Sequence, residues 1–137
     1  MWIDWIIVSV GTGLLLVGSA LLVKWMMFWR KEGMTHAKIK AQDRLITYGM
    51  YSYVRHPHYL SVILICFGIS LLSLYFFSPS FPFSILPFVP SVFVLLCFYR
   101  LAIKEEKKLI EQFGNEYVEY KKRVPMFIPR VREENQT

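Results

Sequence analysis

The chain has 137 residues, a net charge of +6 and a hydrophobic content of 55%. The length fits a single domain covering residues 1–137, and the mean hydropathy of +0.38 is too high for an ordinary soluble domain. No nucleic-acid recognition motif accompanies the basic charge, so we expect no nucleic-acid partner. Basic segments beside apolar stretches are instead typical of contact with membrane lipid headgroups.

Three stretches of 19 residues contain no charged side chain, at 5–23, 59–77 and 81–99. A helix of that length measures roughly 28 Å, close to the thickness of about 30 Å of a bilayer core. We therefore expect an all-α, polytopic membrane bundle, followed by a C-terminal amphipathic helix. Its three transmembrane helices are predicted at about 5–29, 57–77 and 81–99.

The positive charges predict the orientation of these spans. All lysines and arginines lie between residues 24 and 55 or between 100 and 132. With three spans both groups fall on one side, which the positive-inside rule makes cytoplasmic. Trp25 and Trp29 suit an interfacial aromatic belt at that side. We expect a multi-pass integral membrane protein with two cytoplasmic segments, 30–56 and 100–137.

Glycine and proline positions predict the local breaks. The polar segment after the first span suggests a short surface helix around 37–46, and Gly49 supplies a turn. Pro57 fits the first turn of the second span, where its missing N–H has no consequence. Pro87 and Pro90 lie inside the third predicted span, so we expect a kink or a locally freed carbonyl there.

The helix predicted after the third span, at 99–113, carries a buried-charge signal. On a helical wheel Glu106 falls in the middle of the apolar face, whereas Glu111 lies on the polar face. A carboxylate facing the interior needs a partner, because burying it alone costs several kcal/mol. One interpretation is an ion pair with Arg55 or Arg100, or a helix end outside the bilayer. The other is a carboxylate that receives donor groups of a ligand.

Arg55 and His56 stand at the predicted N-terminus of the second span and allow two interpretations. In one, Arg55 reaches lipid phosphates and Tyr59 joins the aromatic belt. In the other, the free N–H groups and partial positive charge of the helix N-terminus form an anion site with these side chains. A metal site is not expected, because no cysteine or carboxylate completes a ligand set around His56 and His58.

Residues 45–59, LITYGMYSYVRHPHY, resemble the central motif of the isoprenylcysteine carboxyl methyltransferase and phospholipid methyltransferase superfamily. Residues 105–125, EEKKLIEQFGNEYVEYKKRVP, together with Pro129, resemble the C-terminus of its carboxyl methyltransferase branch. Two motifs in this order around a hydrophobic hairpin form a specific signal. The resemblance covers about residues 44 to 130, with Met50 where proline is usual and Ser61 where glycine is usual.

The resemblance implies methyl transfer from S-adenosyl-L-methionine to a lipophilic acceptor, with carboxyl methylation of an isoprenylcysteine-like substrate most resembled. It implies a cofactor site made of Gly49, Tyr51, His56, Tyr59, Glu105 and Glu106. It also implies that Arg55 and Arg100 orient the acceptor carboxylate, with Glu106 as a further catalytic candidate for proton transfer. Lipidated or small lipophilic substrates and membrane lipids are the expected partners, and a homodimer is compatible with so thin a bundle.

Two other functional classes stay open at this point. Membrane sterol and steroid reductases, which bind NADPH, carry a similar arginine-histidine-proline motif. Their tails generally contain aspartates and cysteine, whereas this tail has adjacent glutamates and no cysteine. A non-catalytic membrane scaffold is the third class, which the presence of both polar motifs disfavours.

Overall fold

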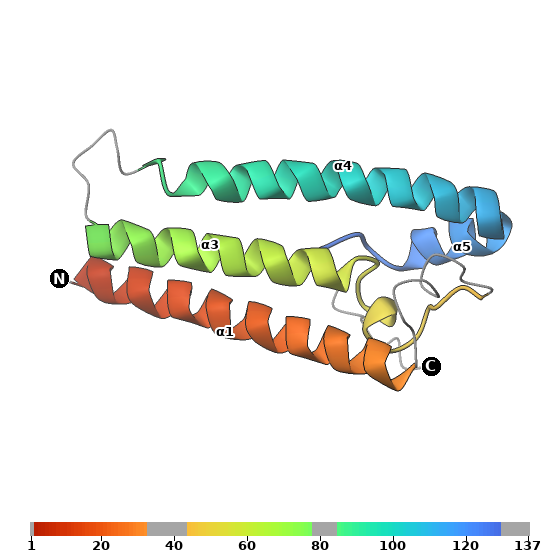
Figure 1. Ribbon diagram of the computed structural model, residues 1–137, viewed down its shortest axis with the longest axis horizontal. Helices are drawn as coiled ribbons and strands as arrows, with labels where there is room; N and C mark the ends of the chain where they lie inside the picture. Colours follow the sequence, from red (N-terminus) through yellow and green to blue (C-terminus); the bar gives the residue numbers. More distant parts are fainter. Residues whose placement is uncertain (1, 33–43, 78–84, 130–137) are drawn as a thin grey trace, which may run out of the picture.

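The computed structural model describes residues 2–32, 44–77 and 85–129. Within these ranges the chain is all-helical, without strands, which confirms the predicted fold class at that level. Three long helices lie lengthwise beside one another, and a short helix caps one end (Figure 1). They are α1 (Trp2–Lys31), α3 (Pro57–Phe77), α4 (Phe88–Phe113) and the short α5 (Asn115–Arg123).

Helices α1 and α3 pack closely because glycines line their contact. A Cβ atom on Gly68 would lie 2.8 Å from the backbone oxygen of Gly11, and one on Gly18 would lie 2.9 Å from that of Ser61. Such distances leave no room for a side chain. Ser61, the residue that departs from the usual glycine, is fully buried in this contact. Its hydroxyl donates a hydrogen bond to the backbone oxygen of His58, 2.6 Å away, and so it needs no partner on α1.

Helix α4 runs antiparallel to α3 (Figure 1). A polar contact joins the start of α4 to the second half of α3. The Ser70 hydroxyl lies 2.7 Å from that of Ser91 and 2.6 Å from the backbone oxygen of Pro87. Pro87 immediately precedes α4 and Pro90 lies in its first turn, so the prolines begin the helix instead of interrupting it. The prediction that both prolines lie inside a span, with a kink there, is therefore wrong, and the Pro87 carbonyl accepts a hydrogen bond from Ser70.

Two described helices are long and apolar enough to cross a membrane, Trp2–Lys31 and Pro57–Phe76. They agree with the first two predicted spans, and α3 has the predicted bounds of 57–77. The third predicted span begins within 78–84, outside the described residues. From Phe88 to Tyr99 the apolar part of α4 is only about 18 Å long, so a third span stays a prediction.

The end of the bundle beside Lys31 holds the loop and tail. Gly49 adopts a φ of 65°, as its predicted role in a turn requires, and opens the 3-10 helix η1 (Gly49–Ser52). Gly114, with a φ of 56°, ends α4 and reverses the chain into α5, which the sequence had not predicted. The surface helix predicted around 37–46 lies mostly outside the described residues, and its described part, 44–46, is not helical.

Candidate active site

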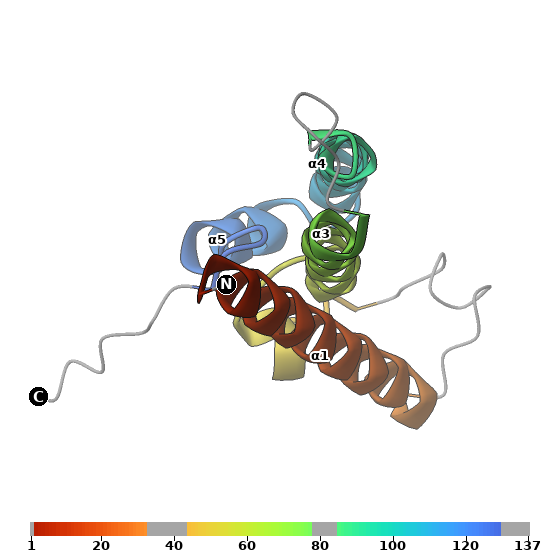
Figure 2. The ribbon, with the colours of Figure 1, turned by 90° about the vertical axis from the view of Figure 1, so that its left-hand side faces the viewer.

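Four segments meet at one end of the molecule: the start of α3, the second half of α4, η1 and α5 with the tail behind it (Figure 1). Backbone hydrogen bonds fasten the tail to the start of α3, from Arg55 to Pro125 (2.9 Å) and from His56 to Met126 (3.2 Å). The Tyr120 hydroxyl adds a hydrogen bond to the backbone oxygen of Tyr51, at 2.6 Å. The C-terminal segment thereby closes over the arginine-histidine motif, and Figure 2 shows the same arrangement in the end view.

A buried ionic cluster lies under this closure. Glu106 is 2% exposed, and the Arg55 guanidinium donates a hydrogen bond to its Oε1. His56 Nε2 lies 3.4 Å from the same oxygen, and Lys121 Nζ lies 2.8 Å from Oε2. The helical wheel is therefore confirmed: Glu106 faces the interior while Glu111 is exposed. Of the two predicted arginine partners, the structure pairs Glu106 with Arg55.

The charges around Glu106 keep its carboxyl ionised. Burial by itself raises the pKa of this group, but contacts with His56 and Lys121 and the charge of Arg55 outweigh burial and lower the pKa to about 2. Tyr117 lies buried beside the cluster, and burial together with the Glu106 charge raises the pKa of its phenol to about 12. Near neutral pH the cluster therefore contains a carboxylate and a neutral phenol.

Three buried polar atoms of the cluster have no hydrogen-bond partner among the described residues: Arg55 Nε, His56 Nε2 and Glu106 Oε2. The Lys121 ammonium approaches Oε2 as an ion pair, but without the geometry of a hydrogen bond. Buried polar atoms are nearly always paired in folded proteins, and leaving one unpaired costs about 1–3 kcal/mol. The two nitrogens therefore lack a hydrogen-bond partner among the described residues, and Oε2 has only its ion pair with Lys121.

Parallel aromatic rings form a wall next to the cluster. The His56 ring is parallel to that of Tyr59 at 5.4 Å, and Tyr59 is stacked on Phe98 at 4.6 Å. The Tyr59 hydroxyl donates a hydrogen bond of 2.6 Å to Glu105, whose side chain is half-exposed. Phe127 from the tail lies against the other side of His56. The wall therefore places stacked aromatic rings directly beside buried charge.

A second aromatic group holds the Gly49–Ser52 loop in place. The indoles of Trp25 and Trp29 both donate to the Tyr51 hydroxyl, at 3.1 and 3.2 Å. Trp25 is also stacked on His58, with ring centroids 4.5 Å apart. The two tryptophans predicted as an interfacial belt therefore have partners inside the protein.

The structure brings together most of the predicted site residues, which are Arg55, His56, Tyr59, Glu105 and Glu106. Tyr51 lies under the tail, whereas Gly49 contacts Phe28 on the α1 side. Arg100 is exposed, and no contact with the cluster is found for it within the described residues. Sequence reasoning missed Lys121 and Phe127. The run of basic residues at 121–123 gave no sign of which lysine turns inward, and α5 itself was not predicted.

Comparisons with known proteins identify the family of the chain. The sequence profile of the phospholipid methyltransferase family matches residues 6–116, most of the chain. The chain belongs to this family. Its membership confirms the resemblance noted from the two motifs. No solved structure matches the chain.

Two named proteins are similar to this chain. A protein-S-isoprenylcysteine O-methyltransferase of Saccharomyces cerevisiae is 42% identical over 93 residues, covering 67% of this chain and 35% of the yeast protein. A protein of the same name from Schizosaccharomyces pombe is 34% identical over 107 residues, covering 74% of this chain and 42% of that protein. The chain thus spans well under half the length of these relatives.

Proposed function

We propose that this protein is an integral membrane methyltransferase that uses S-adenosyl-L-methionine and acts on a lipophilic acceptor. The observation that carries the proposal is the buried cluster of Arg55, His56 and Glu106, in which three polar atoms lack a hydrogen-bond partner among the described residues, beside an aromatic wall. Membership of the phospholipid methyltransferase family supports methyl transfer. The comparisons give no support to the reductase alternative.

The residues of the cluster fit this cofactor. Glu106 Oε2 can accept hydrogen bonds from ribose hydroxyls or from an ammonium, and Arg55 Nε can donate to a carboxylate. When bound, S-adenosyl-L-methionine supplies a methyl group already activated by its sulfonium. The chain then has mainly to position the reactants and exclude water, a task for which the closed tail is suited.

The charge state of Glu106 argues against its predicted role in proton transfer. With a pKa of about 2 this carboxylate is too weak a base to deprotonate an amine or a thiol near neutral pH. A carboxylate acceptor needs no general base. We infer that the acceptor is a lipid-linked carboxylate, the class that the names of the two yeast relatives also indicate. His56 remains the candidate base if the acceptor is an amine or a thiol.

The roles predicted for the arginines stay proposals of unequal support. Arg55 already pairs with Glu106, and its Nε has no hydrogen-bond partner among the described residues. Arg100 is exposed on α4 and would have to meet the acceptor outside the cluster. We therefore propose Arg55 as a cofactor-positioning residue and Arg100 as a contact at the entry for the acceptor.

A third membrane crossing is part of the proposal. Helix α4 runs antiparallel to α3 along most of its length (Figure 1). Because Glu106 near one end of α4 pairs with Arg55 at the start of α3, the chain between them has to cross and return. The site then lies at the basic, cytoplasmic face. A homodimer stays a prediction.

Transfer of tritiated methyl groups to a farnesylated cysteine tests this proposal. The purified protein in mixed micelles should label the free acid but not its methyl ester, and base should release the label as volatile methanol, because only esters hydrolyse in this way. We expect Glu106→Gln to lower the rate by at least roughly a hundredfold, in the range of lost transition-state positioning, and Glu111→Gln to leave it unchanged. Labelling that resists base would contradict a carboxylate acceptor.

A further inference from the structure

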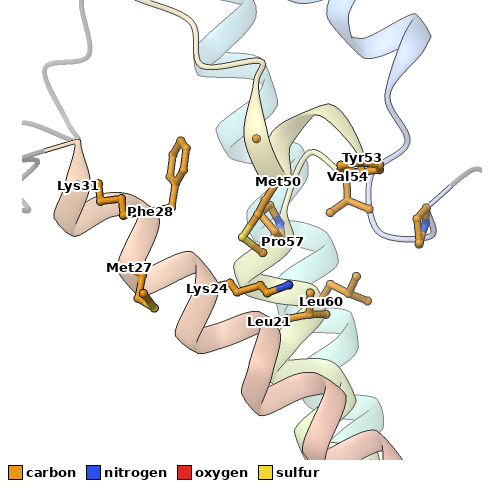
Figure 3. A pocket seen from close by; sticks show the side chains of 12 residues that line it. Leu21, Lys24, Met27, Phe28, Lys31, Met50, Tyr53, Val54, Pro57 and Leu60 are labelled. Atoms are coloured by element: carbon orange, nitrogen blue, oxygen red, sulfur yellow. The ribbon is translucent and has the colours of Figure 1, made fainter.

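A cavity lies between α1 and the segment 49–57, away from the ionic cluster. Its volume is about 650 Å³, within the range of small-molecule sites in proteins. Figure 3 shows α1 along one wall and the loop with the start of α3 along the other. Most of the lining is apolar, as in Leu21, Met27, Phe28, Met50, Val54 and Leu60.

The backbone of residues 54–57 separates this cavity from the cluster. Val54 and Pro57 line the cavity, whereas Arg55 and His56 between them turn toward Glu106. A molecule in the cavity therefore lies behind the cluster, on the other side of one extended segment. This arrangement does not suit a methyl acceptor, which has to reach the transferred methyl group directly.

Two lysines place positive charge on the α1 wall of the cavity. Lys24 and Lys31 both line it, and Figure 3 shows the Lys24 side chain extending from α1 toward Leu60. Seven residues separate them, so they share one helix face about 10.5 Å apart. Neither lysine forms an ion pair with a residue in the described ranges, in contrast to Arg44, which pairs with Glu32 at 2.9 Å.

The charged and apolar parts of the cavity are arranged like the headgroup and acyl chain of a lipid. Lys31 lies at the end of α1, at the face proposed as cytoplasmic, and Leu21 lies about 15 Å further along the helix. Positive charge at the membrane surface with apolar walls below it complements an anionic headgroup and its acyl chain. We propose that this cavity binds an anionic phospholipid, with its phosphate between Lys24 and Lys31 and an acyl chain along the α1 wall.

A lipid in this position would support the catalytic segment from behind. Val54 and Pro57 would contact its acyl chain, while the neighbouring Arg55 and His56 hold the cluster. The proposal goes beyond the proposed methyl transfer and does not depend on it, since lipid binding is measured without cofactor or acceptor.

Native mass spectrometry of the purified full chain in detergent tests the proposal, with dioleoyl phosphatidylglycerol and dioleoyl phosphatidylcholine as probes. We expect tighter binding of the anionic lipid, weakened roughly tenfold to thirtyfold in the double variant Lys24→Gln and Lys31→Gln. The charge-preserving pair Lys24→Arg and Lys31→Arg should retain most of the binding. The matched control is Lys107→Gln with Lys108→Gln, two exposed lysines on the outer face of α4, which should bind as the wild type does.

Three results would overturn the proposal. Equal affinity for the two lipids would mean that the cavity does not recognise negative charge. An equal loss in the Lys107→Gln and Lys108→Gln control would mean that the attraction is diffuse. Displacement of the bound phospholipid by farnesylcysteine at stoichiometric concentration would assign the cavity to the acceptor instead. Helix content measured by circular dichroism confirms that each variant is folded before its binding is compared.

Discussion

At the scale of single residues, Glu106 decides the chemistry of the site. It is buried among Arg55, His56 and Lys121, and these neighbours keep it ionised although burial opposes ionisation. Its second oxygen has no hydrogen-bond donor within the described residues. Lys121, half-exposed on α5, is the neighbour that a ligand could displace most readily, because its side chain can extend into solvent.

The stability of the protein should depend on pH through Glu106. Its pKa is about 2 in the folded protein, against an ordinary value of 4.5. Its ionic contribution is therefore complete above about pH 4.5 and declines as the pH falls toward 2. We expect Glu106→Gln to destabilise the protein by about 3–5 kcal/mol at pH 7, because the partner charges stay buried.

Thermal unfolding in detergent, followed by circular dichroism from pH 7 to pH 3, measures this contribution. The difference between wild type and Glu106→Gln should narrow below about pH 4.5. Glu111→Gln serves as the control, since Glu111 is exposed. A difference between wild type and Glu106→Gln that stays constant down to pH 3 would show that the carboxyl has no depressed pKa.

At the scale of helices, the contact of α1 with α3 depends on the absence of side chains at Gly11, Gly18 and Gly68. Gly68→Ala would place a methyl group 2.8 Å from the backbone oxygen of Gly11, which has no freedom to move aside. We expect a loss of about 1–3 kcal/mol in the free energy of unfolding, as for other overpacked contacts. Thermal unfolding of the purified protein checks this.

Gly13→Ala is the matched control on the same helix as Gly11. A Cβ atom there meets nothing within 4 Å, and alanine favours helix by about 1 kcal/mol over glycine. This variant should be as stable as the wild type or slightly more stable. A destabilisation of equal size in both variants would mean that glycine content, and not close packing, determines the effect.

The helices were largely predictable from the sequence because hydrophobic length and prolines indicate their extent. The predicted bounds of 57–77 match α3, where Pro57 fits the first turn. Pro87 and Pro90 were misread, since apolar composition continues across the true start of α4 and hides it. Helix α5 escaped prediction because its nine residues are mostly polar, and its place depends on tertiary contacts such as the packing of Tyr117 and Tyr120 and the ion pair of Lys121 with Glu106.

At the scale of the whole molecule, pairs far apart in sequence build the site. Arg55 and Glu106 are 51 residues apart, and the hydroxyl of Tyr120 reaches the backbone of Tyr51 across 69 residues. The helical wheel predicted that Glu106 faces inward, and the two motifs predicted that it lies beside Arg55 and His56. No sequence pattern placed Lys121, because its approach depends on the reversal at Gly114.

The proposed topology predicts which residues are accessible from outside the cell. In a background without Cys66 and Cys97, Lys31→Cys and Lys108→Cys should resist a membrane-impermeant maleimide in intact cells and react after lysis. Trp2→Cys should react from outside, because three spans place the two basic ends opposite the N-terminus. Labelling of Lys108→Cys in intact cells would rule out the third crossing.

The central claim is that the cluster around Glu106 binds the methyl donor, and calorimetric titration of the purified protein with S-adenosylhomocysteine tests it most directly. NADPH is titrated in parallel, with Glu106→Gln and Glu111→Gln as paired variants of similar helix content. We predict saturable binding of S-adenosylhomocysteine to the wild type and Glu111→Gln, weakened at least about tenfold in Glu106→Gln, the loss of one charged hydrogen bond. Binding of NADPH alone, or equal effects of the two variants, would contradict the claim.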